Sequence, residues 1–462
     1  MPANEDNMGY PCDAIVEQWK RGRLLNVLME GTAAMKRAGE EFLPREPEES
    51  QEAYNSRIEK TYLLNAFRRT VNYLSGEIFS RPLILQDDVP QEIKDLTENI
   101  DLEGNCLDVF AKRVFEAGLV DGVSAILVDH VQAPTNLTIE EEKKQGVRPY
   151  WVHIPVGNIL GWRIKTVAGK PIITQIRIKE SVEIPKGKYG TESVPRIRVI
   201  NLGSYQVYED TSGGKEKEWK LVESGETTFT DEIPLVIFRP GEKITHMTAR
   251  SPLEDLAYLN LAHYQSNSDQ TTILHHARVP LLFGKMIADD PTKIVIGPRR
   301  MIHSNHEDAS LVFVEHSGQA IGAGRDDLDD LEQRMALWGL QLLMPKTGRI
   351  TATEKALSSS ENDCTLKTYA LQFKDSLETA LGHTAKWLKL EKGGSVVVNT
   401  EFRLLTTADA DILIKSKMAG ILPRRTVLQE FLRRGIISED SDIDQIHELL
   451  MEEGDNFLGV RQ

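Results

Sequence analysis

The 462-residue sequence predicts an α+β protein in which two long helices flank a small β-rich insert. Three observations carry this prediction. Short apolar segments between residues 124 and 240 alternate with turn residues, as antiparallel strands do. A long helix begins near Ser251 and continues to His276. After a β-like segment at Leu281–Lys285, a second helical period runs over Arg325–Met344.

Length and composition indicate a folded protein of two or more domains. The hydrophobic fraction of 40% and the charged fraction of 27% are ordinary for a globular chain. The net charge of -15 argues against broad adhesion to nucleic acid or anionic membranes, because phosphate contacts dominate such binding. An acidic wall could still surround DNA without sticking to it.

Cysteine usage and hydropathy narrow the class of protein. Cys12, Cys106 and Cys364 lie far apart without zinc-ligand spacing, which predicts reduced thiols in a protein made in the cytosol. The polar, acidic first residues are unlike a signal peptide. The longest apolar segment, around Ala125–Val128, is too short to span a bilayer, so no membrane partner is expected.

The N-terminal part of the chain predicts mostly helices. An amphipathic helix is expected over Trp19–Met35, and a polar linker over Pro44–Glu49. A single helix is expected from Glu52 to Phe79, and another over Cys106–Gly118. The apolar segment Ser124–Asp129 then predicts a buried strand.

Residues 150 to 240 predict a set of antiparallel hairpins, because short apolar segments alternate there with Gly, Pro, Asp and Lys turns. The expected strands are Tyr150–Ile154, Ile172–Ile178, Ile197–Leu202, Tyr205–Tyr208, Trp219–Val222 and Leu235–Phe238.

The helix near Ser251 carries the clearest start signal in the chain. Ser251 can cap it, Pro252 suits its first position, and Glu254 can close a capping box. Between Gln265 and Thr272 its apolar stripe almost vanishes. We expect this segment to bridge solvent or to pack against copies of itself, because it offers its own chain's core little apolar surface.

The returning helix, expected over Arg325–Met344, is strongly acidic in its first turn. The acids are Asp326, Asp327, Asp329, Asp330 and Glu332. Acids there favour the helix dipole, which is the simpler interpretation. Five acids exceed what the dipole needs, so negative charge facing a channel is the second interpretation.

A loop with two cations, Lys346 and Arg349, follows this helix. An ordinary exposed loop is the simpler interpretation. In a cyclic assembly the same loop would form a ring of positive charge, and rings of charged side chains line pores. A further helix is expected from Thr351 toward Glu391, ended by a pair of glycines. The elements expected after it are a strand over Val396–Leu405 and helices starting near Asp409, Pro423 and Ser441.

No catalytic constellation stands out, so the sequence predicts neither an enzyme nor a bound cofactor. The motifs of zinc proteases, serine hydrolases and nucleotide-binding loops are missing. His275 and His276 are adjacent and point apart on a helix, so they are poorly placed to chelate one metal. Asp409 and Asp411 could pair as carboxylates, but a helix start explains them more simply.

Five stretches, in this order along the chain, resemble tailed-bacteriophage portal proteins, in particular portal-like proteins grouped as a domain of unknown function. Asp121–His130 resembles a wing strand, Ser251–Gln270 the first stem helix, and Ala277–Lys285 the entry into the clip. Thr351–Ala370 resembles the stretch after the tunnel loop, and Ile421–Ile437 the crown helix pair. Each stretch is short, and their order makes the resemblance specific.

The resemblance implies a ring, usually dodecameric in that family, at one vertex of a phage head. The implied divisions are a wing over residues 1–250, stem helices over 251–278 and 325–344, a clip over 279–324, a tunnel loop over 345–352, a connecting helix over 353–399 and a crown over 400–462. The protein would be made in the bacterial cytoplasm and would reside in the virion.

The resemblance also implies partners and channel-facing residues. Lys346, Thr347 and Arg349 would face DNA in the tunnel loop, and negative charge on the channel wall would come from Asp269, Asp326, Asp327 and Asp330. The implied partners are copies of the chain, double-stranded DNA, the terminase large subunit, a head-tail adaptor, and the major capsid and scaffold proteins.

Two other classes of protein stay open. One is a phage-head hydrolase, such as a protease or nuclease, against which the missing nucleophile–base pair and metal cluster argue. The other is a scaffold or adaptor that forms no ring. A monomer of that kind would leave the polar helix segment 265–272 bathed in solvent.

Overall fold

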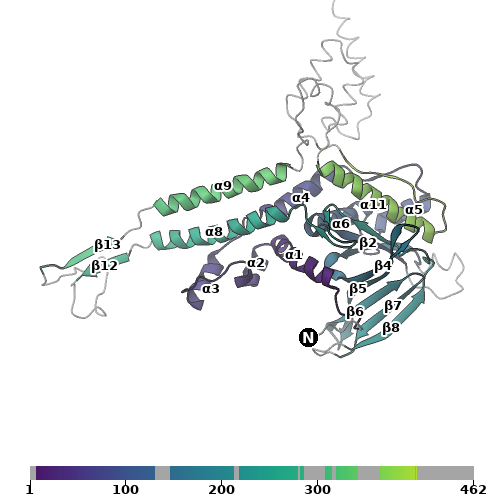
Figure 1. Cartoon of the computed structure of the whole chain (residues 1–462), viewed down its shortest axis with the longest axis horizontal. Helices are drawn as coiled ribbons and strands as arrows, with labels where there is room; N and C mark the ends of the chain where they lie inside the picture. Colours follow the sequence, from purple (N-terminus) through teal and green to yellow (C-terminus); the bar gives the residue numbers. More distant parts are fainter. Residues whose placement is uncertain are drawn as a thin grey trace, which may run out of the picture. The chain divides into compact units, whose positions relative to one another are not determined.

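The computed structural model describes residues 7–130, 146–212, 218–278, 281–285, 307–314, 319–341, 365–400 and 402. The chain divides into two compact units, and almost all of the second, Glu401–Gln462, lies outside the described residues. The first unit, Met1–Thr400, mixes helices and sheets, which confirms the α+β class (Figure 1). The helices expected near Asp409, Pro423 and Ser441 belong to the part that is not described.

Four helices form the N-terminal part. They are α1 (Asp13–Glu30), α2 (Thr32–Ala38), α3 (Gln51–Lys60) and α4 (Ala66–Ile78). The single helix expected over Trp19–Met35 is wrong, because the chain breaks at Gly31 with φ of 94°. This left-handed conformation is one that glycine adopts readily and that ends a helix.

The single helix expected from Glu52 to Phe79 is also wrong, because residues 61 to 65 separate α3 from α4. The Thr61 hydroxyl donates to the carbonyl of Arg57 at 2.8 Å, and Thr61 itself is extended. The Asn65 side chain caps α4 by accepting from the Arg68 amide at 2.9 Å. An asparagine cap fixes a new helix start even where the apolar period continues.

A three-stranded antiparallel sheet lies at the centre of the unit in the order β3-β2-β9. Its members are β2 (Ser124–His130), β3 (Pro149–Pro155) and β9 (Leu235–Phe238). The helix α6 (Leu107–Asp121) leads into β2 through Gly122, whose φ is 77°. A Cβ atom at Gly122 would lie 2.8 Å from the backbone of Arg250, so only glycine fits this turn.

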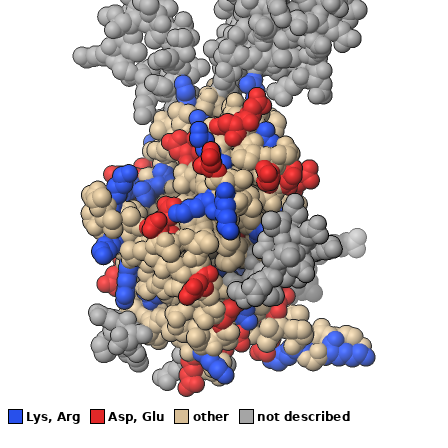
Figure 2. All heavy atoms as spheres, turned by 90° about the vertical axis from the view of Figure 1, so that its right-hand side faces the viewer, with Lys and Arg blue, Asp and Glu red and all other residues tan. Residues whose placement is uncertain are grey.

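A second sheet has five antiparallel strands in sequence order. They are β4 (Ile159–Val167), β5 (Lys170–Lys186), β6 (Gly190–Asn201), β7 (Ser204–Asp210) and β8 (Trp219–Glu226). The expected hairpins are therefore confirmed for β5 to β8, whereas the expected strands Tyr150–Ile154 and Leu235–Phe238 fall in β3 and β9 and pair with β2 instead. On the face of the unit shown in Figure 2, lysines and arginines lie among aspartates and glutamates.

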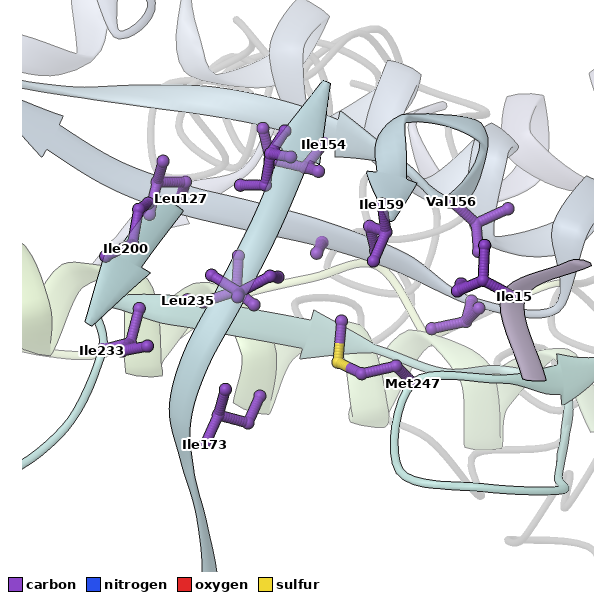
Figure 3. Close-up of a cluster of buried hydrophobic side chains, with 14 of the residues drawn as sticks. Ile15, Leu127, Ile154, Val156, Ile159, Ile173, Ile200, Ile233, Leu235 and Met247 are labelled. Carbon is purple, nitrogen blue, oxygen red and sulfur yellow. The ribbon is translucent and has the colours of Figure 1, made fainter. Parts of the chain in front are cut away.

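The main hydrophobic core forms where α1 and the two sheets meet (Figure 3). Ile15 of α1, Ile154 of β3, and Ile176 and Ile200 of the second sheet are almost completely buried there. A second group of packed rings joins the three-stranded sheet to α11 (Thr365–Trp387). In it, the ring centroid of Phe373 lies 4.8 Å from that of Phe238 and 5.4 Å from that of Phe115.

The remaining elements are short, except for a long helical pair. The short ones are α5 (Gln91–Leu96), β1 (Ile84–Leu85), β10 (Glu242–Lys243), β11 (Ala249–Arg250) and β14 (Val396–Val397). The pair consists of α8 (Glu254–Arg278) and α9 (Gln319–Gln341). Strand β12 (Leu281–Lys285) follows α8 in the chain, and strand β13 (Ser310–Val314) precedes α9. Figure 1 shows α9 running back alongside α8, with the β12–β13 ribbon at one end.

Two boundaries differ from expectation in this region. The returning helix begins at Gln319 rather than Arg325, so Gly322 and Gly324 lie inside it. The connecting helix α11 ends at Trp387 rather than at the glycine pair, and Lys389 takes a left-handed φ of 57° just after it. The expected strand at Val396–Leu405 is confirmed for Val396–Val397, and residues 401 and 403–405 of it lie outside the described residues.

Candidate functional site

The two long helices α8 and α9 form the candidate site, and α8 is anchored first. Leu253, Leu256, Ala257 and Tyr264 are completely buried against the N-terminal helices. The Ser251 hydroxyl accepts from the amide of Leu253 at 3.1 Å, as a cap should. The first half of α8 is therefore fixed by the body of its own chain.

Except for the exposed Asp269, the polar middle of α8 is buried or half-buried and is hydrogen-bonded within the same chain, which corrects the expectation that it bridges solvent or meets other copies. Asn260, which has no exposed surface, donates to the carbonyl of Leu64 at 2.8 Å and accepts from the amide of Phe67 at 2.9 Å. Asn267 donates to the carbonyl of Tyr62 at 3.1 Å.

The partner of this polar face is the segment between α3 and α4. Its backbone is not helical at residues 61 to 65, so its amides and carbonyls need partners other than an i−4 neighbour. Amide side chains on α8 supply them. The non-helical segment between α3 and α4 thus accounts for the polar face of α8, whose side chains supply the hydrogen bonds that this segment lacks.

A buried ion pair holds α3 beside α8. The Arg57 guanidinium donates to both carboxylate oxygens of Glu49, at 2.8 and 2.7 Å, and to the carbonyl of Pro44 at 2.8 Å. The hydrogen bond from Arg57 lowers the pKa of Glu49, against the effect of burial. Ser268 of α8 reaches the same cluster through the Thr61 hydroxyl at 2.9 Å.

The helix α9 contacts α8 along one face. Gln270 of α8 donates to the carbonyl of Ile321 at 3.0 Å. A Cβ atom at Gly324 would lie 2.2 Å from the Gln270 side-chain oxygen, so the glycine permits this close approach. Met335, further along α9, is 2% exposed.

The predicted acids fall into two groups. Asp327 accepts a hydrogen bond from Ser266 at 2.8 Å, so it joins the two helices. Asp330 pairs with Arg334 one turn later on α9, at 2.6 Å. Asp326 and Asp269 are exposed. The structure therefore places Asp326 and Asp330 on the outer side of α9 and Asp327 at the seam.

Helical geometry defines the outer face of α9. At 100° per residue, Asp326, Asp330, Gln333 and Leu337 form one stripe that points away from the residues packed on α8. All four side chains are exposed, and Leu337 is 57% exposed despite its size. We call this stripe the outer face of α9.

The predicted DNA-facing residues Lys346, Thr347 and Arg349 lie outside the described residues, as does the expected helix start at Thr351. Within the described residues, no group of three or more His, Cys, Asp or Glu side chains could hold a metal ion. No helix there is long and apolar enough to cross a membrane.

Sequence reasoning missed the interaction between α8 and the segment at residues 42 to 67. One signal was available, because four amide or hydroxyl side chains within Asn260–Ser268 recur at helical spacing. A polar stripe with that period indicates hydrogen bonding to an irregular backbone as well as exposure to solvent. Periodicity alone does not tell the two apart.

Comparison with known families finds a match over the part of the chain that contains the helical pair. A domain of unknown function, DUF4055, matches residues 252–388, which contain α8, β12, β13, α9 and α11. No curated protein matches the sequence.

Solved structures that this chain resembles in part come from gene transfer agent (GTA) particles. One is the neck of a native GTA particle computed with C12 symmetry, with 10% identity, a TM-score of 0.40, and coverage of 78% of this chain and 88% of that one. Another is the virion of a native gene transfer agent particle, with 11% identity, a TM-score of 0.42 and the same coverage. Likeness at this level carries no functional conclusion.

Proposed function

We propose that this chain is the subunit of a portal, a ring at one vertex of a tailed-phage capsid through which double-stranded DNA is packaged and ejected. In its coarser form the proposal is a structural component of a phage-like particle. In its finer form the ring docks the terminase large subunit and later the head-tail connector proteins. It acts without catalysis.

The outer face of α9 is the observation that carries this proposal. The helix packs on α8 along one side and exposes the stripe from Asp326 to Leu337 on the other. Tyr258 of α8 is similarly 56% exposed. Two paired helices cannot bury large side chains on both outer sides, so a neighbouring subunit is the natural cover.

A head-to-tail contact between such helical pairs leads to a closed ring when its rotation closes. In the ring, Leu337 and Tyr258 would lie in the seams between subunits. Asp326 and Asp330, which lie three and two turns before Leu337 along the stripe, would border the channel beyond the seam. Because like charges repel phosphate, DNA would slide along this wall without a deep binding well.

A non-ring adaptor is the rival function, and one observation favours it. The polar middle of α8 finds its partners within its own chain, through Asn260 and Asn267, so it no longer requires other copies. The ring proposal therefore depends on the outer face of α9.

Electron microscopy of the purified protein, with mass photometry across a range of concentrations, tests the proposal. Rings with a central hole support it. A particle near 52.0 kDa at every concentration, including mixtures with the major capsid and scaffold proteins, would contradict the ring and favour the adaptor. Metal-dependent DNA cleavage by the pure protein would contradict the non-catalytic role.

A further inference from the structure

A groove of about 890 Å³ lies between β9, the beginning of β5 and one side of α11. The described chain places no strand against β9 on this side, since β9 is the outer strand of its sheet. This groove is separate from the helical pair α8 and α9, and the portal proposal makes no use of it.

The free edge of β9 faces the groove. Val128 donates to the carbonyl of Pro234 at 2.9 Å, and Val236 lies opposite Ile126. In an antiparallel pair, hydrogen-bonded and open positions alternate. The backbone groups of Ile237 therefore point away from β2, and Ile237 lines the groove.

The other wall suits a peptide backbone. One polar stripe of α11 lines the groove with Gln372, Asp375, Ser376, Thr379, His383 and Lys386. The apolar side chains of Ile172 and Ile173, near the beginning of β5, line another part of the groove. A strand laid along β9 would alternate its side chains between a polar and an apolar environment.

Arg239 gives the groove its charge preference. Its Nη2 donates to the carbonyl of His246, while its Nε is buried without a hydrogen-bond partner among the described residues. Glu232, one of three acids that line the groove, is already paired with Lys386 at 3.2 Å and His383 at 3.7 Å. No ion pair joins Arg239 to a carboxylate in the described chain, and the part of its guanidinium that lines the groove could receive one from an incoming segment.

We propose that this groove binds an extended segment of a partner protein, which adds to β9 as an outer strand and places an aspartate or glutamate against Arg239. Strand addition of this kind gains affinity from the main chain and specificity from alternate side chains. The site goes beyond the proposed function, because it requires no ring.

A protein strand fits the groove better than nucleic acid does. Asp231, Glu232 and Asp375 line it together with its cations, and they would repel a phosphate backbone. The apolar side chains of Ile172 and Ile173 also match valine-like side chains. Arg239 and Lys170 line the groove without an ion pair among the described residues, and Arg239 is the one beside β9, so a carboxylate on the added strand would lie against it.

Fluorescence anisotropy with the full-length protein tests the site. The probe is a labelled ten-residue peptide of alternating threonine and valine with one central glutamate. Matched peptides carry lysine or glutamine in place of the glutamate, or N-methyl groups at alternate backbone positions. We expect the glutamate peptide to bind at least about tenfold tighter than the lysine and N-methylated peptides.

Protein variants locate the binding. Arg239→Gln should weaken binding of the glutamate peptide at least about tenfold, while the affinity for the glutamine peptide stays nearly unchanged. Arg163→Gln, which removes an exposed cation of β4 outside the groove, should change neither. Circular dichroism and electron microscopy confirm that both variants fold and assemble like the wild type, so ring failure and site failure are distinguishable.

Three outcomes overturn the proposal. The first is absence of saturable binding of the glutamate peptide below roughly 1 mM, and the second is equal binding of glutamate and lysine peptides. The third comes from photo-cross-linking with p-benzoylphenylalanine in place of Thr379. Cross-links to the same chain or a second copy that excess peptide cannot prevent would assign the groove to this protein itself.

Discussion

Replacing Asn260 with alanine should destabilise the joint between α8 and the N-terminal helices. The side chain is fully buried and serves two backbone groups at once, the carbonyl of Leu64 and the amide of Phe67. Both groups lie where the chain leaves helical geometry between α3 and α4. Neither gains a new partner when the amide is removed.

The magnitude follows from the two hydrogen bonds. A buried polar group left without a partner costs about 1–3 kcal/mol, so two such groups cost about 2–6 kcal/mol. The side chain removed is small, so the cavity adds little. We expect Asn260→Ala to lower the free energy of unfolding by roughly 3–5 kcal/mol.

Urea unfolding followed by tryptophan fluorescence measures the loss, and hydrogen exchange at the Phe67 amide locates it. Ser266→Ala is the matched control on the same helix, because its hydrogen bond to Asp327 is exposed. The control should cost less than about 1 kcal/mol. An Asn260→Ala protein as stable as the control, with unchanged exchange at Phe67, would refute the assignment of these two bonds.

Three further predictions concern other parts of the chain. Burial raises the pKa of the Asp121 carboxyl from 3.8 to about 6, so the folded state loses stability as pH rises from about 4 through 6. Asp121→Asn should remove that loss, which amounts to up to about 3 kcal/mol of unfolding free energy at neutral pH. Urea unfolding that gives the same change in unfolding free energy between pH 4 and pH 7 for wild type and variant would contradict this. Leu337→Asp should abolish rings in electron micrographs, whereas Tyr189→Asp, at a site that is 88% exposed and away from α9, should not. Rings from both variants would show that α9 lies outside the subunit contact. Replacing both Lys346 and Arg349 with alanine should shorten or release packaged DNA, because the two cations would otherwise hold its phosphates. Unchanged packaged length and phage titre would exclude this role for the loop.

The sheets were predictable because their signals are local. A short apolar segment bounded by turns gives β2, and the spacing of turns gives the hairpins after it. Strand β4 escaped prediction, since Arg163, Lys165 and Thr166 interrupt the apolar pattern where the strand is exposed. Its pairing with β5, and not its own side chains, makes it a strand.

The candidate site was predictable only in part, because its decisive contacts are distant in sequence. The start of α8 and the acids of α9 were visible as local patterns. The helix break at residues 61 to 65 was hidden, since Leu63 and Phe67 keep the apolar period across it. The partners of Asn260 are backbone groups that no side-chain periodicity reports.

The pairing of β1 with β14 has a consequence for synthesis on the ribosome. Ile84 lies opposite Val397, so 397 − 84 = 313 residues must be made before this contact can form. At about 5–20 residues per second, Ile84 waits roughly 15–60 s for its partner. Phe115 waits for 373 − 115 = 258 further residues and Phe238 for 373 − 238 = 135 before Phe373 of α11 is made. The nascent chain therefore carries unfinished apolar surface through most of translation, and holding chaperones should bind it until α11 emerges.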